Sequence, residues 1–366
     1  MRVLLIQGGF GTGGAEKVMA AVAAHRLALG DEVHVAGMFM PAAGSFFPYP
    51  DGVTLHVLSQ AGPQDRLLQL RRLAAIRRLI RQVQPQVILS FLIKVNCLTL
   101  LAALGTGVPV VISERNNPLL QAPRFWRHMQ RGLSCLAAGI ATQTAGARGD
   151  LPLWSRKRTV VVPNVCLPVA FQPPPAATLC RFVAVGRLDR QKGFDLLLDA
   201  MAAMAQPAEL TIFGGGPERD ALSDRIHMLG LSHRVRLGGV TRDPSEWLGA
   251  GDAVVVSSRY EGFSNVVAEA TCSGLPIISF DCLYGPGEMV VDGVNGLLVP
   301  VGDVAGLAAA MDRLAADPDL RARLARAPEV VARQLAPERI MVLWDALIDG
   351  AAVRPQPARL ASAASS

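Results

Sequence analysis

The sequence is poor in aromatic residues and in charge. Aromatic residues make up 5% of the 366 positions and charged residues 18%, whereas hydrophobic residues make up 51%. Intrinsic disorder requires low hydrophobicity and high charge, so this chain is expected to fold. Its 35 glycines and 25 prolines follow no three-residue repeat, which excludes a collagen-like chain. Nucleic acid is not an expected partner, because aromatic residues are scarce and no nucleic-acid-binding motif is present.

Closely spaced cysteines are also missing. None of the six cysteines belongs to a C-x-x-C pair, so their spacing favours neither a zinc site nor a thioredoxin-type motif. The chain is also too long for a small disulfide-stapled scaffold. We therefore expect buried free thiols in a reducing compartment at Cys97, Cys135, Cys166, Cys180, Cys272 and Cys282.

No apolar run is long enough for a membrane span or a secretion signal. The run after Met1 ends at Gly8, too early for the apolar part of a signal peptide. The uncharged residues 95–113 and 159–180 are interrupted by glycine or proline. The sequence predicts a cytoplasmic chain, either free or peripheral on the inner face of the cell membrane.

Charge is present but unevenly placed. The net charge of +6 conceals a basic half, because residues 1–170 carry 18 Lys+Arg against 7 Asp+Glu, a net charge of +11. The remaining residues carry 18 Lys+Arg against 23 Asp+Glu, a net charge of −5. The two halves should therefore meet different partners.

Short β-branched runs alternate with amphipathic stretches in both halves. This alternation predicts an α/β fold of two Rossmann-like parallel-sheet domains that face each other across a cleft. The proline-rich stretch between the halves marks the linker. We expect an N-terminal domain at 1–167, a linker at 168–179, a C-terminal domain at 180–335, a helix crossing back at 336–350 and a disordered tail at 351–366.

A glycine-rich loop follows the first expected strand. Residues 9–14 match G-x-G-x-x-G and precede a helix, an arrangement that suits a phosphate. No acidic residue ends the second expected strand at 33–37, so the site lacks the ribose ligand of a dinucleotide site. We expect a loop that faces a phosphate rather than NAD, and a tight turn without a ligand is the alternative.

The second half carries a cationic loop and a pair of glutamates. Arg187 and Lys192 lie in residues 186–193, after a strand, where a guanidinium and an ammonium suit a diphosphate. Glu261 precedes an expected helix and Glu269 lies inside it. Two carboxylates beside helix N-terminal amides could hold the hydroxyls of a nucleotide sugar, with its diphosphate between them. Surface or structural ion pairs are the alternative interpretations.

With these motifs, the sequence resembles the retaining glycosyltransferases of the GT4 family, which have the GT-B fold. The matching motifs are G-G-x-E at 13–16, G-R-x-x-x-x-K-G at 186–193, the Gly216-Pro217 turn and E-x7-E at 261–269. The resemblance implies that Arg187 and Lys192 neutralise the leaving diphosphate, and that Glu261 contacts the donor sugar. It also implies donor-binding residues at Gly186, Gly214, Gly216, Arg236, Phe263, Ser264, Asn265, Val266 and Glu269, the last of these on the ribose.

Residues 113–116 and 281–288 resemble a bacterial subgroup that extends polyprenyl-diphosphate-linked oligosaccharides. The resemblance implies transfer of a hexose or N-acetylhexosamine from a UDP-sugar, with UDP-GalNAc favoured, to such a lipid-linked acceptor or another bacterial glycan. It places the acceptor or phosphate side at Gly13, Gly14, Glu16, Glu114, Arg115 and Asn116. A histidine common in the family is absent from 113–116.

No metal or other cofactor is expected. The single D-x-D sequence, Asp317 to Asp319, is better interpreted as a turn and helix cap than as a metal motif. The catalytic work therefore falls to fixed cations and amides around the diphosphate.

Residues 64–82 form a basic amphipathic pattern. Arg66, Arg71, Arg77, Arg78 and Arg81 share one predicted face, and Leu67, Leu70, Leu73, Ala74 and Ile80 lie largely on the other. Such a helix suits an anionic membrane surface, and an ordinary outer helix is the alternative.

Three other functions compete with glycosyl transfer. A UDP-sugar epimerase could share the architecture. An NAD(P) oxidoreductase is disfavoured by the missing ribose acid, and a non-catalytic sugar-binding module is disfavoured by the intact cations and glutamates.

Overall fold

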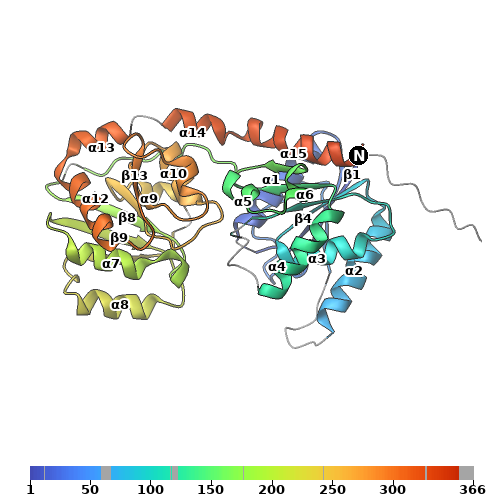
Figure 1. Ribbon diagram of the computed structural model, residues 1–366, viewed down its shortest axis with the longest axis horizontal. Coiled ribbons are helices and arrows are strands. Elements are labelled where there is room, and N and C mark those ends of the chain that lie inside the picture. The colour runs from blue at the N-terminus through green and yellow to red at the C-terminus, as the bar shows by residue number, and fades with distance from the viewer. Residues whose placement is uncertain are drawn as a thin grey trace, which may run out of the picture. The chain divides into compact units, whose positions relative to one another are not determined.

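The computed structural model describes residues 1–353 except Thr12, 59–66, Asn116, 118–122, Ala176, Arg242 and 326–327. Contacts divide the chain into two compact units (Figure 1). Unit 1 comprises Met1–Pro163 together with the residues from Ile340 onward, and unit 2 comprises Asn164–Arg339.

Unit 1 is built on a seven-stranded parallel sheet with the order β3-β2-β1-β4-β5-β6-β7. Its central strands are buried along almost their whole length, because helices cover both faces and residues of either side-chain orientation are enclosed. The strands are β1 (Arg2–Gln7), β2 (Glu32–Gly37), β3 (Thr54–Val57), β4 (Val87–Phe91), β5 (Val110–Ser113), β6 (Gly139–Thr142) and β7 (Thr159–Val161).

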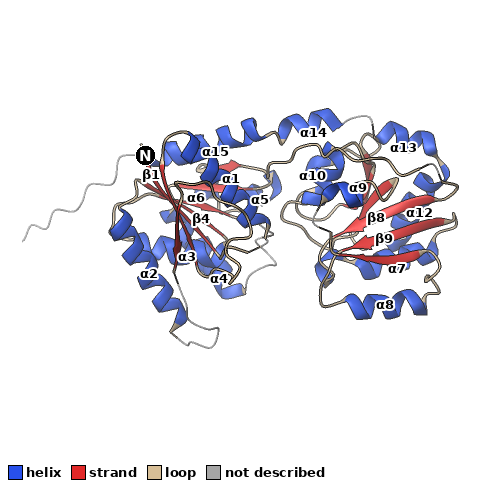
Figure 2. Cartoon of the chain, turned by 180° about the vertical axis from the view of Figure 1, so that it is seen from behind, coloured by secondary structure: helices blue, strands red, loops and turns tan. Residues whose placement is uncertain are grey.

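The helices of unit 1 cover its sheet on both sides (Figure 2). One hydrophobic cluster joins β1, β4 and β5 to α2 and α3. Elsewhere in the unit, Trp344 of the last helix stacks on Phe91 of β4 with 5.6 Å between ring centroids. The helices are α1 (Gly14–Ala28), α2 (Leu68–Val83), α3 (Ile93–Ala103), α4 (Arg124–Leu133), η1 (Ser134–Leu136), α5 (Ala145–Gly149), α6 (Leu153–Arg156) and, from Ile340 onward, α15 (Pro337–Ala352).

Unit 2 repeats the scheme with a six-stranded parallel sheet of order β10-β9-β8-β11-β12-β13. Its strands are β8 (Cys180–Val185), β9 (Ala208–Phe213), β10 (Val235–Gly239), β11 (Ala253–Val256), β12 (Ile277–Phe280) and β13 (Gly296–Val299). The helices are η2 (Arg190–Lys192), α7 (Phe194–Ala203), α8 (Arg219–Met228), α9 (Pro244–Leu248), α10 (Asn265–Cys272), α11 (Pro286–Met289), α12 (Val304–Ala316), α13 (Pro318–Leu324) and α14 (Pro328–Gln334).

Two hydrophobic clusters sandwich this second sheet. One contains residues of α7, α8, α12 and α13, and the other contains residues of α9, α10 and α14. The expected architecture of two parallel-sheet α/β domains is therefore confirmed. The expected strands include residues 3–7, 87–90 and 253–257, and the structure adds β3, β6, β7 and β13 to the expected set. The chain passes between the units at Pro163 and Asn164.

Helix α2 is present, but the expected division of its faces is wrong. Its buried residues are Leu68, Ile76, Leu79, Ile80 and Val83, whereas Leu67 and Leu70 are 53% and 63% exposed and Ala74 is exposed. Arg77 is partly buried and donates to the carbonyls of Ala102 and Leu104 at 2.9 and 2.8 Å, so it caps α3 instead of facing solvent. Arg66 lies outside the described residues.

The cysteines are free, and five of the six are buried as expected. Cys135 is exposed, because η1 carries it onto the surface of unit 1. Among the described helices, none combines the length and apolar character needed to cross a bilayer. The expected tail falls mainly at 354–366, outside the described residues, and α15 continues to Ala352.

Candidate active site

The cationic loop and the first glutamate lie at the place where the chain order of the second sheet reverses. β9 and β10 lie on one side of β8, and β11, β12 and β13 lie on the other. Ligands of open α/β sheets bind beyond the carboxyl ends of the strands at such a reversal. Residues 186–193 follow β8 and residues 257–261 follow β11, so the topology brings these two motifs together.

Two glycines let the loops after β8 and β9 pack backbone against backbone. A β-carbon on Gly214, whose φ is +148°, would overlap the carbonyl oxygen of Gly186. A β-carbon on Gly216 would overlap the carbonyl of Leu188. The amide of Leu188 donates to the carbonyl of Gly215 at 3.0 Å, which holds the two loops together.

A second close approach joins the loops after β8 and β11. Gly193 has a φ of +63°, and a β-carbon there would overlap the carbonyl oxygen of Ser257. The hydroxyl of Ser257 donates to the carbonyl of Lys192 at 2.9 Å, and the Gln191 side-chain amide donates to the carbonyl of Tyr260 at 3.0 Å. The cationic loop is therefore fixed against the residues that precede Glu261.

Lys192 and Glu261 form an ion pair at this junction. The Lys192 Nζ lies 2.6 Å from Glu261 Oε1, and the Ser258 hydroxyl donates to the same oxygen at 2.7 Å. Glu261 is 4% exposed, so its charge is largely removed from water and depends on these partners. The structure thus joins two of the three residues expected to be catalytic.

Arg187 does not take part in that ion pair. Its Nε lies 2.5 Å from Asp189 Oδ2, and its side chain is 66% exposed. Asp189 also accepts from the amide of Lys192 at 3.3 Å and so caps η2. Arg187 therefore lies at the surface of the same loop, with its guanidinium accessible to a ligand.

The start of α10 provides the expected helix N-terminus. Ser264 is 1% exposed, and its hydroxyl has no hydrogen-bond partner among the described residues. The side chain of Asn265 accepts from Asn164 at 2.7 Å. Phe263 and Val266 are half-buried, and Glu269 is partly exposed in the following turn.

Arg236 lies in β10, which β9 separates from β8 in the sheet. This strand is the outermost on its side of the sheet. The Arg236 Nε donates to the Thr211 hydroxyl at 2.9 Å across to β9.

In unit 1, the glycine-rich loop precedes α1 as expected. Gly13 and Gly14 are exposed, and the carboxylate of Glu16 folds back over Gly13, where a β-carbon would overlap it. Burial raises the pKa of Glu16. Nearby, buried Gln7 donates to the hydroxyl of Tyr49 at 3.1 Å, and burial raises the pKa of Tyr49 to about 12.

The structure separates the expected acceptor residues Glu114 and Arg115. Arg115 is buried with its guanidinium 5.5 Å from the ring centroids of both Phe91 and Trp344, and it donates to the carbonyl of Val162 at 3.0 Å. Burial lowers the pKa of Arg115 to about 9. Asn116 lies outside the described residues.

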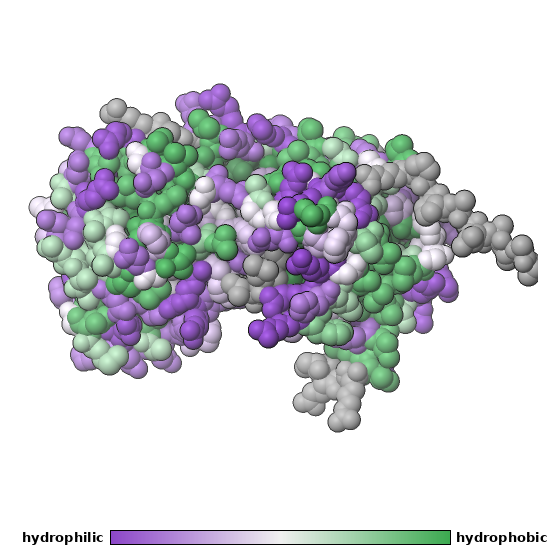
Figure 3. Space-filling model, in the orientation of Figure 1, coloured by the Kyte–Doolittle hydropathy of each residue, from purple (hydrophilic) through white to green (hydrophobic). Residues whose placement is uncertain are grey.

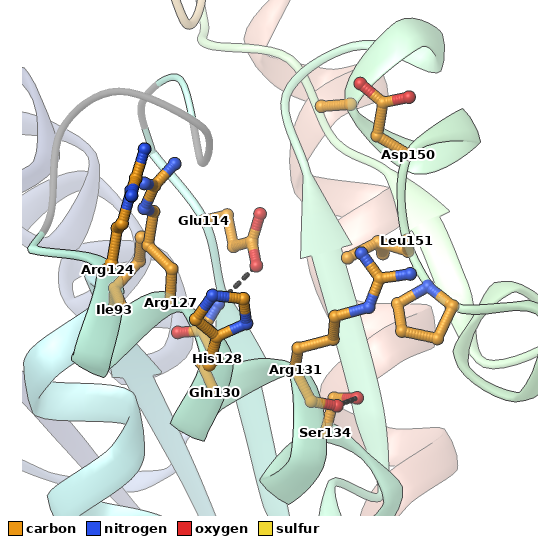
Figure 4. Close-up of a pocket in the computed structure, with 12 residues that line it drawn as sticks. Ile93, Glu114, Arg124, Arg127, His128, Gln130, Arg131, Ser134, Asp150 and Leu151 are labelled. Atoms are coloured by element: carbon orange, nitrogen blue, oxygen red, sulfur yellow. Dashed lines mark hydrogen bonds between the residues drawn. The ribbon is translucent and has the colours of Figure 1, made fainter.

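Glu114 instead lines a pocket of about 180 Å³. Figure 4 shows Arg124 and Arg127 on one side of it and Arg131 on the other, with Glu114 and His128 between them. Gln130 donates a hydrogen bond to Glu114. Burial raises the pKa of Glu114 to about 7, and the hydrogen bond from Gln130 opposes this rise.

Sequence reasoning missed the residues that α4 contributes to this pocket. Their spacing at 124, 127, 128 and 131 is the i, i+3, i+4, i+7 pattern of one helical face, and it was the signal that could have found them.

Within the described parts of the chain, no group of three or more histidine, cysteine, aspartate or glutamate side chains could hold a metal ion. The prediction for the D-x-D sequence is confirmed, since Asp317 caps α13 by accepting from the amide of Leu320 at 2.8 Å.

Two Rossmann-like units, with a cationic loop and a glutamate at the sheet reversal of the second, define the GT-B glycosyltransferase class. The family model "Glycosyl transferase 4-like domain" matches residues 13–165, and the model "Glycosyl transferases group 1" matches residues 180–317. The chain belongs to the GT4-type glycosyltransferases of the GT-B fold.

Relatives and solved structures agree with this assignment. The chain is 38% identical over 159 residues to the lipopolysaccharide core biosynthesis glycosyltransferase LpsE of Rhizobium meliloti, covering 43% of this chain and 46% of LpsE. It spans about half or less of the length of the first curated relatives it matches.

The solved structures match over nearly the whole fold. The lipopolysaccharide outer core galactosyltransferase WaaB superposes with a TM-score of 0.77 at 18% identity, over 95% of this chain and 99% of WaaB. HepE of Anabaena in complex with UDP superposes with a TM-score of 0.79 at 20% identity, over 95% of this chain and 100% of HepE.

We predict that Glu114→Gln removes the part of the pH dependence of the free energy of unfolding that the ionisation of Glu114 causes in the wild type. The carboxyl ionises near 4.5 when unfolded and near 7 when folded, so the free energy of unfolding falls as pH rises through that window. At pH 8 the variant should be more stable than the wild type by on the order of 1–3 kcal/mol. Urea unfolding at pH 4.5, 6 and 8 measures this difference.

His128→Gln is the matched control, because His128 lines the same pocket and the substitution leaves Glu114 in place. The control should retain the slope that Glu114 causes. Equal slopes in the wild type and Glu114→Gln would show that Glu114 is ionised in the folded protein at neutral pH.

Proposed function

We propose that the protein is a retaining glycosyltransferase that moves a hexose or N-acetylhexosamine from a UDP-sugar, with UDP-GalNAc favoured, to a polyprenyl-diphosphate-linked or other bacterial glycan. The observation that carries this proposal is the Lys192–Glu261 pair at the sheet reversal of unit 2, beside the start of α10. In this position the Lys192 ammonium suits the diphosphate end of a sugar diphosphate, and the buried Glu261 carboxylate suits the hydroxyls of its sugar end.

The reaction requires stabilisation of the negative charge that develops on the leaving group. The bond from the sugar to the diphosphate breaks with positive charge on the sugar and negative charge on the departing UDP. Lys192, Arg187 and the amides of residues 263–266 stabilise the departing diphosphate, since fixed donors act strongly in a site that excludes water. Glu261 accepts from the hydroxyls of the sugar, and Glu269 accepts from those of the ribose.

The donor and acceptor classes are supported by the proteins that this chain resembles. HepE of Anabaena has been solved with UDP and with UDP-glucose. LpsE is named for lipopolysaccharide core biosynthesis, and the relative AmsD of Erwinia amylovora is named for amylovoran biosynthesis. A bacterial surface glycan is therefore the acceptor class that we propose.

Glu261→Ala should abolish transfer, and Lys192→Ala should slow it by about 10²–10³-fold, because each removes a partner of the reacting group. Radiolabelled UDP-GalNAc, UDP-GlcNAc, UDP-glucose and UDP-galactose are incubated with lipid-linked glycan, and the products are separated. Asp224→Asn, an exposed carboxylate of α8, is the control and should retain full activity.

Full activity of folded Glu261→Ala would refute the assigned role. Incubation with each UDP-sugar alone distinguishes the alternative enzyme, because an isomerised sugar nucleotide formed without acceptor would identify an epimerase.

We also propose that transfer needs no metal ion, because Lys192 and Arg187 supply the positive charge beside the diphosphate. Turnover should be unchanged after treatment with EDTA. Loss of turnover on chelation, with recovery on adding Mn²⁺ or Mg²⁺, would overturn this proposal.

We propose further that unit 1 contacts an anionic membrane on the cytoplasmic side through the exposed face of α2. Leu67 and Leu70 are exposed there, and so are Arg78 and Arg81. Figure 3 shows hydrophobic side chains at the start of this helix. Apolar side chains beside arginines suit the boundary between acyl chains and anionic headgroups.

The membrane proposal predicts sedimentation with anionic phosphatidylglycerol vesicles at low salt but not with neutral phosphatidylcholine vesicles. Leu70→Asp should reduce the bound fraction several-fold, because it puts a negative charge at the apolar contact. Met228→Asp, an exposed apolar residue of α8, should not. Equal sedimentation with both lipids would refute the proposal.

A further inference from the structure

The polar face of α4 gathers positive charge around the pocket in unit 1. Arg124, Arg127 and Arg131 all line it, with His128 between them in the helix. Arg124 and Arg131 form no salt bridge with any residue that the structure describes. Figure 3 shows hydrophilic side chains gathered over this helix. Positive side chains grouped around a pocket are an arrangement that suits an anion.

The floor of the pocket is held by a buried hydrogen-bond chain. Asn96 of α3 donates to the carbonyl of Ser113 and to the side-chain oxygen of Gln130, both at 3.1 Å. Gln130 in turn donates to Glu114. The other carboxyl oxygen of Glu114 is buried and has no partner among the described residues, although Glu114 is only 6% exposed. A buried polar atom without a partner is costly, and a ligand in the pocket would supply one.

Charge and size limit what this ligand is. Three guanidinium groups face two carboxyl groups, Glu114 and Asp150, and Glu114 holds its proton more firmly than an ordinary carboxyl group. The surplus positive charge suits a dianion better than a single carboxylate. The volume of about 180 Å³ is enough for a phosphate or diphosphate group.

We propose that this pocket binds a phosphate or diphosphate group of the acceptor, with Arg124, Arg127 and Arg131 around the anion and Glu114 hydrogen-bonded to it from the floor. The inference rests on the proposed function, since it names the part of the acceptor that unit 1 recognises. Each guanidinium group can donate two parallel hydrogen bonds to two phosphate oxygens. The protonated carboxyl group of Glu114 donates a hydrogen bond to another phosphate oxygen.

Calorimetric titration with inorganic pyrophosphate tests the pocket without any turnover. The full chain is titrated in the presence of saturating UDP, which occupies the diphosphate site proposed in unit 2. Arg131→Ala should weaken pyrophosphate binding by about 10–100-fold, the equivalent of one lost charged hydrogen-bonding partner. Arg131→Lys keeps the positive charge but loses the paired N–H donors of the guanidinium. Its affinity for pyrophosphate should lie between those of Arg131→Ala and the wild type.

Lys157→Ala is the matched control, because it removes one exposed positive charge from the same unit. It should leave the affinity unchanged. Equal affinities for the wild type and a folded Arg131→Ala would overturn the pocket assignment, as would equal weakening in Lys157→Ala, which would indicate attraction by net charge alone.

The two sources of the group are distinguished by competition with pyrophosphate. A water-soluble prenyl diphosphate that competes better than a hexose monophosphate indicates a lipid-linked acceptor, and the reverse order indicates a phosphorylated glycan. Failure of the proposed function has a separate signature, since it would appear as absent UDP binding or absent sugar transfer while Arg131 still controlled pyrophosphate affinity.

Discussion

The backbone contact of Gly193 with Ser257 positions the candidate site of unit 2. Because no β-carbon intervenes, the loop after β8 lies directly on the loop after β11, and three hydrogen bonds from Ser257, Gln191 and Arg259 hold it there. Lys192 and Glu261, 69 positions apart in sequence, consequently meet at 2.6 Å. The adjacency of β8 and β11 makes this meeting possible, and the glycine sets how close it is.

The pairing of Lys192 with Glu261 also gives the site its electrostatic character. Glu261 is 4% exposed, so its charged form would destabilise the fold if it had no cationic partner. Lys192 is that partner. Under the function proposed above, a sugar diphosphate would offer hydroxyls to the Glu261 carboxylate and oxygens to the Lys192 ammonium. One internal ion pair would then be exchanged for two contacts to the ligand.

The meeting of Lys192 and Glu261 could be predicted from sequence, because both lie in short motifs directly after strands and parallel sheets bring such loops together. The arrangement of the expected acceptor residues could not. Glu114 and Arg115 are neighbours in the chain, yet one lines a pocket and the other is enclosed by Phe91 and Trp344, a difference set by α15 more than 200 positions later. The faces of α2 were assigned wrongly because a helix rich in arginine and leucine has two plausible apolar sides, and packing against α3 decides between them. The strand β3 was missed because it lies at the sheet edge with mostly exposed side chains.

The position of Cys135 gives the molecule a natural attachment point. It is the exposed member of the six cysteines, and it lies in η1 directly after α4, whose arginines line the pocket of unit 1. Thiol-directed dyes react with accessible cysteines and leave buried ones untouched. The unaltered chain therefore accepts a single fluorophore beside that pocket, so that occupancy can be followed optically in a protein with no engineered residue.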